Sequence, residues 1–190
     1  MRIQRNFFVI FIIFSSLIFA ISKFYSFYSN YSDWQYADWL INYQGGFVRR
    51  GFIGEVLFNI HQIFYIKLDI LIFFFVSSLY LLFSYFLFKS LKYLENSNID
   101  LLILFSPGFF LYPIMNTEVI GRKEILFLCI FSSLIFLEKK IHQNIILPLF
   151  IVAITILSLS HSAFIFYAPF FCLLFILIKK NRNLEISPIE

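Results

Sequence analysis

The chain has 190 residues, of which 61% are hydrophobic and 22% aromatic, and its mean hydropathy is +0.85. Soluble domains are about 45–50% apolar, so this composition excludes an ordinary soluble globular protein and is typical of an integral membrane protein. The formal net charge of +4 comes from short basic segments rather than from a basic face, which excludes a nucleic-acid-binding surface.

Six apolar segments approach the roughly 20 residues that a helix needs to cross the hydrocarbon core of a bilayer. They are Phe7–Tyr28, Leu68–Phe88, Ile99–Met115, Val119–Leu137, Ile145–Ser160 and Ser162–Ile178. The first resembles a secretory signal, but Ile18 is too large for the −3 position of a cleavage site at Ala20, so we predict an uncleaved signal-anchor. The sequence therefore predicts an all-α, polytopic membrane protein with one membrane domain over residues 1–190.

The basic residues predict the orientation, because cytoplasmic segments of membrane proteins are rich in Lys and Arg. With the N-terminus inside, nine of the 15 basic residues fall on the inner side: Arg2, Arg5, Lys89, Lys92, Lys139, Lys140, Lys179, Lys180 and Arg182. Both termini are then cytoplasmic. The outer side carries a long first loop, Ser29–Lys67, a turn at Asn116–Glu124 and a turn centred on His161.

Within the first outer loop, Phe52–Ile66 is predicted to form an amphipathic helix that lies on the membrane surface. Its polar residues recur at helical spacing: Glu55, Asn59 and Gln62. Aromatic residues gather before it and are typical of an interfacial belt: Tyr25, Tyr28, Tyr31, Trp34, Tyr36 and Trp39. We therefore expect this loop to stay close to the bilayer.

The same loop contains the densest polar cluster of the chain. Arg49 and Arg50 lie on the translocated side, against the topological bias, and guanidinium groups suit bidentate binding of phosphate or carboxylate. The neighbouring Gly45-Gly46 and Gly51 allow the backbone to approach an anion or to adopt a positive φ. The alternative is a structural ion pair between these arginines and Glu55 or Asp38.

Three further groups of polar residues lie on the predicted outer side. Asp33 and Asp38 are five residues apart, so one could act as a general base or metal ligand while the other orients it; a structural role is the alternative. Glu118 and Arg122 have the spacing of a helix-stabilising ion pair. His161 is either a catalytic residue or a hydrogen-bonded turn residue. No cluster has metal-ligand spacing, so we predict no cofactor, although a divalent metal is compatible with the acidic residues.

The segment DWLINYQGGFVRRGFIGE, residues 38–55, resembles a string in bacterial polytopic proteins encoded in O-antigen and capsule clusters. These are Wzy-like repeat-unit polymerases and related GT-C-like membrane glycosyltransferases. The turns Gly121–Glu124 and Ser160–Ser162 are similar to later polar turns in such proteins, where an acidic residue follows the His directly; here Ser162 follows it. Such polymerases usually carry more than six spans, which is compatible with this chain being an N-terminal portion.

The resemblance implies a multi-pass protein of the bacterial inner membrane that polymerises undecaprenyl-diphosphate-linked repeat units at the outer face of that membrane. It implies catalysis by Asp38, Asp33 or His161. It implies that a second set of residues binds the diphosphate and the glycan: Arg49, Arg50, Gly45, Gly46, Trp39 and Arg122. The expected partners are the lipid bilayer, the polyprenyl-diphosphate-linked oligosaccharide and other membrane proteins of polysaccharide assembly.

Two alternatives remain open at the level of sequence. A GT-C transferase that moves one sugar from a polyprenyl-phosphate donor also uses an acidic residue in its first outer loop, so Asp33 and Asp38 do not separate it from a polymerase. A non-enzymatic transporter or assembly subunit is the other alternative. The confinement of charged residues to span ends weighs against the transporter.

Overall fold

A computed structural model describes residues 2–30, 34–90, 121–137 and 142–186, and all the regular secondary structure in these ranges is helical. The helices are α1 (Arg2–Asn30), α2 (Trp34–Leu40), α3 (Phe52–Phe64), α4 (Leu68–Ser90), α7 (Glu124–Leu137), α8 (Gln143–Ser160), the 3₁₀ helix η2 (Ser162–Tyr167) and α9 (Ala168–Ile186). The all-α prediction is confirmed for these residues. The predicted span Ile99–Met115 lies outside them.

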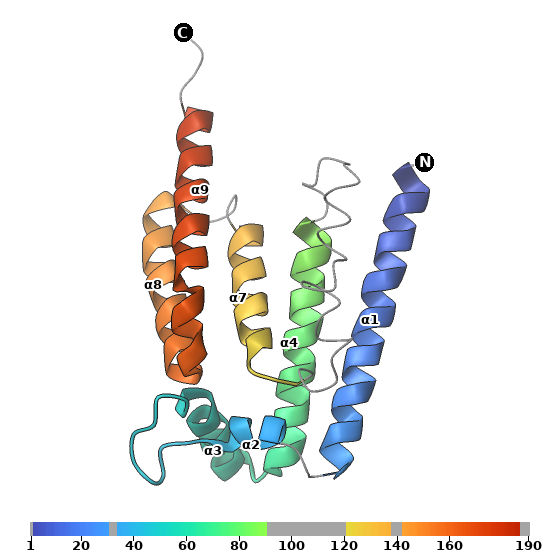
Figure 1. Cartoon of the computed structure of the whole chain (residues 1–190), viewed down its shortest axis with the longest axis vertical. Helices are drawn as coiled ribbons and strands as arrows, with labels where there is room; N and C mark the ends of the chain where they lie inside the picture. Colours follow the sequence, from blue (N-terminus) through green and yellow to red (C-terminus); the bar gives the residue numbers. More distant parts are fainter. Residues whose placement is uncertain (1, 31–33, 91–120, 138–141, 187–190) are drawn as a thin grey trace.

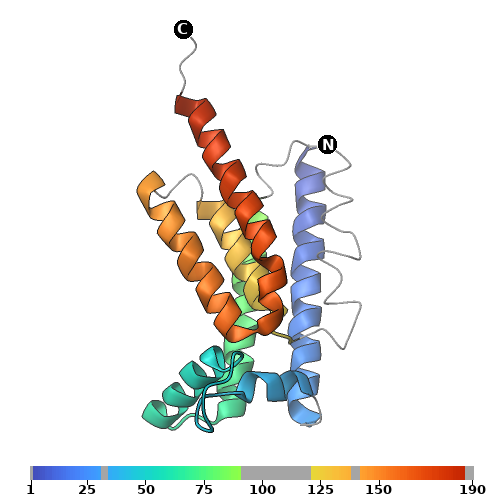
Figure 2. The ribbon, with the colours of Figure 1, turned by 60° about the vertical axis from the view of Figure 1, so that its left-hand side comes forward.

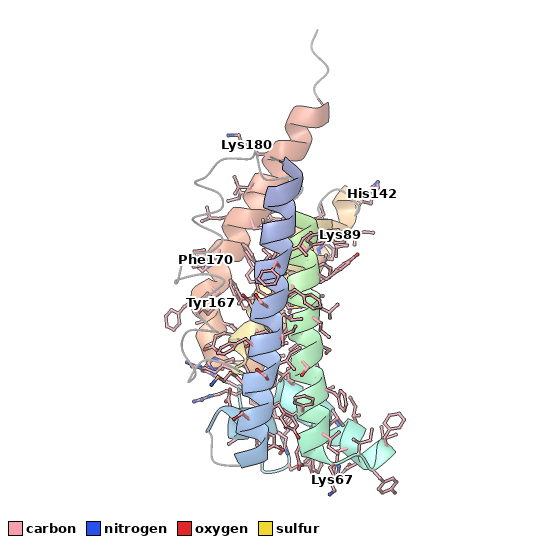
Figure 3. All side chains as sticks on the ribbon, turned by 90° about the vertical axis from the view of Figure 1, so that its right-hand side faces the viewer. Lys67, Lys89, His142, Tyr167, Phe170 and Lys180 are labelled. Atoms are coloured by element: carbon pink, nitrogen blue, oxygen red, sulfur yellow. The ribbon has the colours of Figure 1, made fainter. Side chains whose placement is uncertain are left out.

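The five long helices run along one another, and α2 and α3 lie across one end of the bundle (Figure 1). Helix α4 is central, because it packs against both α1 and α7, while α8 contacts α9, η2 and α3. The start of α1 and the end of α9 lie at the end opposite α2 and α3, as a second view also shows (Figure 2). Lys89, His142 and Lys180 lie toward that same end, whereas Lys67 lies at the α2–α3 end (Figure 3).

Among the described helices, the stretch Leu68–Lys89 of α4 is the one that is long and apolar enough, by length and composition, to cross a membrane. Shorter apolar helical stretches are Ile13–Lys23, Phe52–Phe64, Glu124–Leu137 and Ile145–Ser160. The predicted amphipathic helix over Phe52–Ile66 exists as α3, and it ends where Tyr65 adopts a left-handed conformation with φ of 54°.

Two predicted spans begin later as α-helices than the sequence indicated. Helix α7 starts at Glu124 rather than Val119, because Gly121 has a φ of 82° and the segment Gly121–Lys123 is a turn. The predicted span from Ser162 begins as the 3₁₀ helix η2, and α9 starts at Ala168. Pro169 explains this boundary, because proline has no N–H to donate to the preceding turn and fits only the first turn of an α-helix.

The core is built from aliphatic and aromatic side chains between the long helices. Ile72 and Val76 of α4 are fully buried, and α4 faces the buried Ile125 and Leu126 of α7. Next to it, Phe127 and Phe131 of α7 pack edge-on against Phe171 of α9, with both pairs of ring centroids 5.5 Å apart. This core holds α4, α7 and α9 together and so fixes the ends from which the polar turns emerge.

Candidate functional site

The loop between α2 and α3, residues 41–51, carries the arginine pair and is closed at its base by α3. At Gly54 a side chain would collide with the backbone oxygen of Ile41, so only glycine lets α3 lie this close to the chain that leaves α2. At the next residue, Glu55 Oε2 accepts the backbone N–H of Tyr43 at 2.9 Å. Glu55 Oε1 also accepts the side-chain amide of Gln44 at 3.2 Å. These contacts hold the start of the loop against α3, and the end of the loop continues directly into the same helix.

The tip of the loop is exposed and contains the two arginines. Gly46 turns the chain with a φ of 113°, which confirms that this segment needs a positive-φ glycine, and its N–H donates to the Tyr43 oxygen at 3.0 Å. Phe47 stacks on Tyr43 with the ring centroids 5.4 Å apart, although 74% of Phe47 remains exposed. Arg49 and Arg50 are both exposed.

The alternative role for Arg49 and Arg50 was a structural ion pair with Glu55 or Asp38. Among the described residues, neither guanidinium has a carboxylate within ion-pair distance, so this pair is not formed there. Glu55 is engaged by backbone and amide groups instead, and the carboxylate of Asp38 lies beside Lys123. Within the described residues, the arginine pair is thus exposed and not engaged by these two carboxylates.

Trp39 connects α2 to the turn before α7. Its indole Nε1 donates to the backbone oxygen of Gly121 at 2.6 Å, and the N–H of Gly121 donates to the hydroxyl of Tyr80 at 3.3 Å. Trp39 is 0% exposed and packs edge-on against Phe75. The sequence placed Trp39 in an interfacial aromatic belt, and the resemblance placed it among the glycan-binding residues. In the structure its indole has no exposed surface and instead pairs with the backbone carbonyl of Gly121.

Lys123 occupies the centre of this end of the bundle and is completely buried. Its ammonium donates to the backbone oxygen of Arg50 at 2.9 Å and to that of Ser160 at 3.2 Å. Asp38 Oδ2 lies 3.8 Å from the same nitrogen, and the Trp39 ring centroid lies 5.8 Å from it. Burial lowers the pKa of Lys123 below its ordinary value of 10.5, and the charge of Asp38 opposes this effect.

His161 lies in the turn between α8 and η2, as the sequence predicted. Its N–H donates to Leu157 at the end of α8, and its carbonyl accepts the N–H of Phe164, both at 3.0 Å. The side chain is half-buried. Burial lowers the pKa of the imidazole below 6.5, although the carboxylates of Asp38 and Glu124 act in the opposite direction. The lowered pKa favours the neutral form of the ring, which can accept a proton.

Arg122 and Glu124 are a second pair of charged residues, in the turn before α7 and at the first position of α7. Their side chains make an ion pair of 3.0 Å, and each is about one-third exposed. The other carboxylate oxygen of Glu124 is buried without a hydrogen-bond partner among the described residues. The predicted partner of Arg122, Glu118, lies outside the described residues, as does the candidate catalytic Asp33.

The structure thus brings together some of the predicted site residues and separates others. Asp38 lies beside Lys123, the backbone of Arg50 and the turn that contains His161. Gly45 and Gly46 lie at the exposed loop tip with no other atoms within 4 Å of an added side chain. Sequence reasoning gave Lys123 no role, because nothing in the string Gly-Arg-Lys-Glu indicates which of its charged residues points inward.

The described residues contain no group of three or more His, Cys, Asp or Glu side chains that could hold a metal ion. The chemistry of this end of the bundle, as described, is that of the carboxylates of Asp38 and Glu124, the imidazole of His161, one buried ammonium and exposed guanidinium groups. Comparisons with protein-family models, with curated proteins and with solved structures gave no match to the chain.

Proposed function

We propose that the chain is a multi-pass membrane protein that transfers glycosyl groups at the outer face of the bacterial inner membrane. Its substrate in this proposal is a polyprenyl-diphosphate-linked oligosaccharide of a surface polysaccharide. The composition and the exposed apolar surface support insertion in a membrane. Large apolar side chains more than half exposed occur on several helices, including Phe14 on α1, Phe74 on α4, Ile151 on α8 and Ile176 on α9.

One observation carries the proposal of a glycosyl transfer site. An acidic side chain, the backbone of an arginine-bearing loop and the backbone just before His161, which are distant in sequence, converge on one buried ammonium at one end of the bundle. Lys123 contacts Asp38 directly, and it binds the backbone of Arg50 and of Ser160, the residue before His161. A group-transfer enzyme needs such convergence, because base, leaving group and acceptor must be held in one geometry.

In the proposed reaction, the arginine pair binds the diphosphate. An acceptor hydroxyl attacks the anomeric carbon, the new C–O bond forms and the bond from that carbon to the diphosphate oxygen breaks. The diphosphate leaves with the electron pair, and Arg49 and Arg50 stabilise the negative charge that develops on it. The acceptor proton passes to His161 or Asp38, of which the neutral, half-buried imidazole is the more accessible base.

Substitution of each side chain in the native host tests this function. Arg49→Gln, Arg50→Gln and Asp38→Asn are each expected to shorten or abolish the length ladder of the surface polysaccharide, with the protein present at normal levels. Lys67→Gln is the matched control, because Lys67 is an exposed cation that lies outside the cluster. Normal ladders for all three variants would refute the proposal.

The same experiment separates the proposal from the single-sugar transferase. Asp38, an acidic residue in the first loop with a side chain 14% exposed, is also compatible with a transferase that uses a polyprenyl-phosphate donor. In that case Asp38→Asn removes one sugar from every repeat and leaves the repeats polymerised. Composition analysis of the polysaccharide distinguishes the two outcomes.

A further inference from the structure

Lys123 has no chemical step in the proposed reaction, yet its ammonium contacts three separate segments at this end of the bundle. Its nitrogen touches the α2–α3 loop at the Arg50 carbonyl, α8 at the Ser160 carbonyl, and α2 at the carboxylate of Asp38. The ammonium thus donates two hydrogen bonds to backbone oxygens and forms an ion pair with a carboxylate 3.8 Å away. Burial of a lysine charge costs free energy, which these contacts offset.

The position of Lys123 is fixed independently of those contacts. Gly121, two residues earlier, is held from both sides, because Trp39 donates to its oxygen at 2.6 Å and Tyr80 accepts from its nitrogen at 3.3 Å. The first residue of α7, Glu124, follows Lys123 directly. The lysine therefore extends from a fixed turn to two separate backbone segments, the α2–α3 loop and the end of α8.

We propose that Lys123 is the positioning residue of this site, where its ammonium holds the backbone of Arg50 and of Ser160 and so sets the arginine pair relative to His161. This inference rests on the proposed function for its chemical meaning, whereas the positioning itself is measurable without any substrate. Arg50 is itself the second arginine of the pair, and Ser160 immediately precedes His161. A shift of either carbonyl therefore moves a proposed reactive side chain.

The charges around His161 give the lysine a second measurable effect. The charged groups that act on the imidazole are Asp38 from α2, Glu124 from α7, Lys123 from the turn and Arg50 from the loop. The two carboxylates raise the pKa of His161, and the two cations lower it. Removal of the lysine charge is therefore expected to raise the pKa of His161, an effect that a purely structural lysine distant from the imidazole would not produce.

The test compares Lys123→Met with Lys67→Met, an exposed lysine that serves as the matched control. Spin labels are attached at Val48→Cys and Ser162→Cys in a Cys172→Ser background, because Cys172 is exposed whereas Cys129 is buried. In lipid nanodiscs, Lys123→Met is expected to broaden the distance distribution between the labels, and Lys67→Met to leave it unchanged. Unchanged distances in Lys123→Met would overturn the proposal.

Two further measurements use the same preparation. The imidazole resonances of labelled protein, assigned with His161→Gln, are expected to show a higher pKa for His161 in Lys123→Met. In Lys123→Met, binding of farnesyl diphosphate, a short polyprenyl diphosphate, is expected to weaken roughly 10- to 100-fold, because a displacement of binding groups by about 1 Å has an effect of this size. An unshifted His161 pKa would refute the electrostatic effect of Lys123 on the imidazole, whereas the label distances decide the positioning role.

The outcomes separate this inference from the proposed function. If wild-type protein does not bind farnesyl diphosphate, the diphosphate site fails, while broadened label distances still support positioning by Lys123. If Lys123→Met does not fold, Lys123→Arg replaces it. That variant keeps the charge, but its larger planar guanidinium cannot reproduce the positions of the two hydrogen bonds that the ammonium donates. A shifted label distance in Lys123→Arg supports the proposal, and a wild-type distance refutes it.

Discussion

Glu55 Oε2 accepts the backbone N–H of Tyr43 at 2.9 Å, across twelve positions of the sequence. The carboxylate lies in the first turn of α3, where the helix dipole also favours a negative charge. This single side chain therefore joins the start of the arginine loop to the helix that follows the loop. It explains how a loop with exposed glycines at its tip keeps a defined base.

The first prediction is that Glu55→Ala loosens the arginine loop. Loss of the hydrogen bonds at this partly exposed site is expected to cost about 1 kcal/mol, which raises local opening about fivefold. Trypsin cleaves after Arg and Lys, so cleavage after Arg49 and Arg50 is expected to become faster by a similar factor in nanodiscs. Mass spectrometry locates the cut. Gln62→Ala, an exposed change on the same helix, should retain the wild-type rate.

The second prediction concerns two glycines that look alike in the sequence. An added Cβ at Gly54 would collide with the backbone of Ile41 and Trp39, whereas at Gly45 it would meet no atom within 4 Å. Gly54→Ala is therefore expected to displace α3 from α2 and to destabilise the protein by about 2 kcal/mol or more, because backbone atoms cannot yield as a side chain can. Gly45→Ala should be close to neutral.

Thermal unfolding in detergent measures this pair directly. The expected result is a lower midpoint for Gly54→Ala and a wild-type midpoint for Gly45→Ala. Equal midpoints for the two variants would show that the close approach of α3 to the chain leaving α2 does not exist in solution.

The long helices could be predicted from the sequence because apolar runs and helix length are local properties. The predicted starts of two helices were wrong, because single residues with unusual backbone properties determine where these helices begin. Gly121 turns the chain before α7, and Pro169 delays the start of α9. The amphipathic pattern of α3 was also visible, because Glu55, Asn59 and Gln62 recur at helical spacing.

The candidate site could be predicted only in part, because burial of a polar side chain depends on contacts between distant segments. Asp38, Arg50 and His161 stand out as polar residues in an apolar chain, and they do approach one another. The roles of Trp39 and Lys123 were missed, since each is decided by one backbone carbonyl far away in sequence, Gly121 for the indole and Ser160 for the ammonium. No local pattern specifies such a partner.

The third prediction is that Trp39→Phe destabilises the turn before α7. Phenylalanine keeps the edge-on contact with Phe75 but leaves the Gly121 carbonyl without its buried donor. The expected loss is about 1–3 kcal/mol in the free energy of unfolding. Chemical denaturation followed by far-ultraviolet circular dichroism measures this loss, because that signal does not depend on tryptophan fluorescence. Tyr65→Phe is the control, because Tyr65 is 89% exposed, and a loss as large as that of Trp39→Phe would contradict the assignment.

The fourth prediction follows from His161. Burial lowers the pKa of its imidazole below 6.5, so the folded protein binds this proton less readily than the unfolded chain does. The free energy of unfolding therefore rises with pH from the lowered pKa up to about 6.5. Below the lowered pKa, the folded protein carries the full cost of protonating the half-buried imidazole. His161→Gln is expected to remove this contribution, which makes the variant less sensitive to acid than the wild type. Denaturation midpoints at a series of pH values between 4 and 8 measure the difference.

The sign of the effect of Asp38 provides an internal check on the same imidazole. Asp38 raises the pKa of His161, against the larger effect of burial. Asp38→Asn is therefore expected to lower the pKa of His161 further, the opposite of the shift expected for Lys123→Met. Histidine resonances followed through a pH titration distinguish the two directions. Shifts of the same sign in both variants would mean that the carboxylate and the ammonium do not both face His161, and the proposed arrangement of the site would then be wrong.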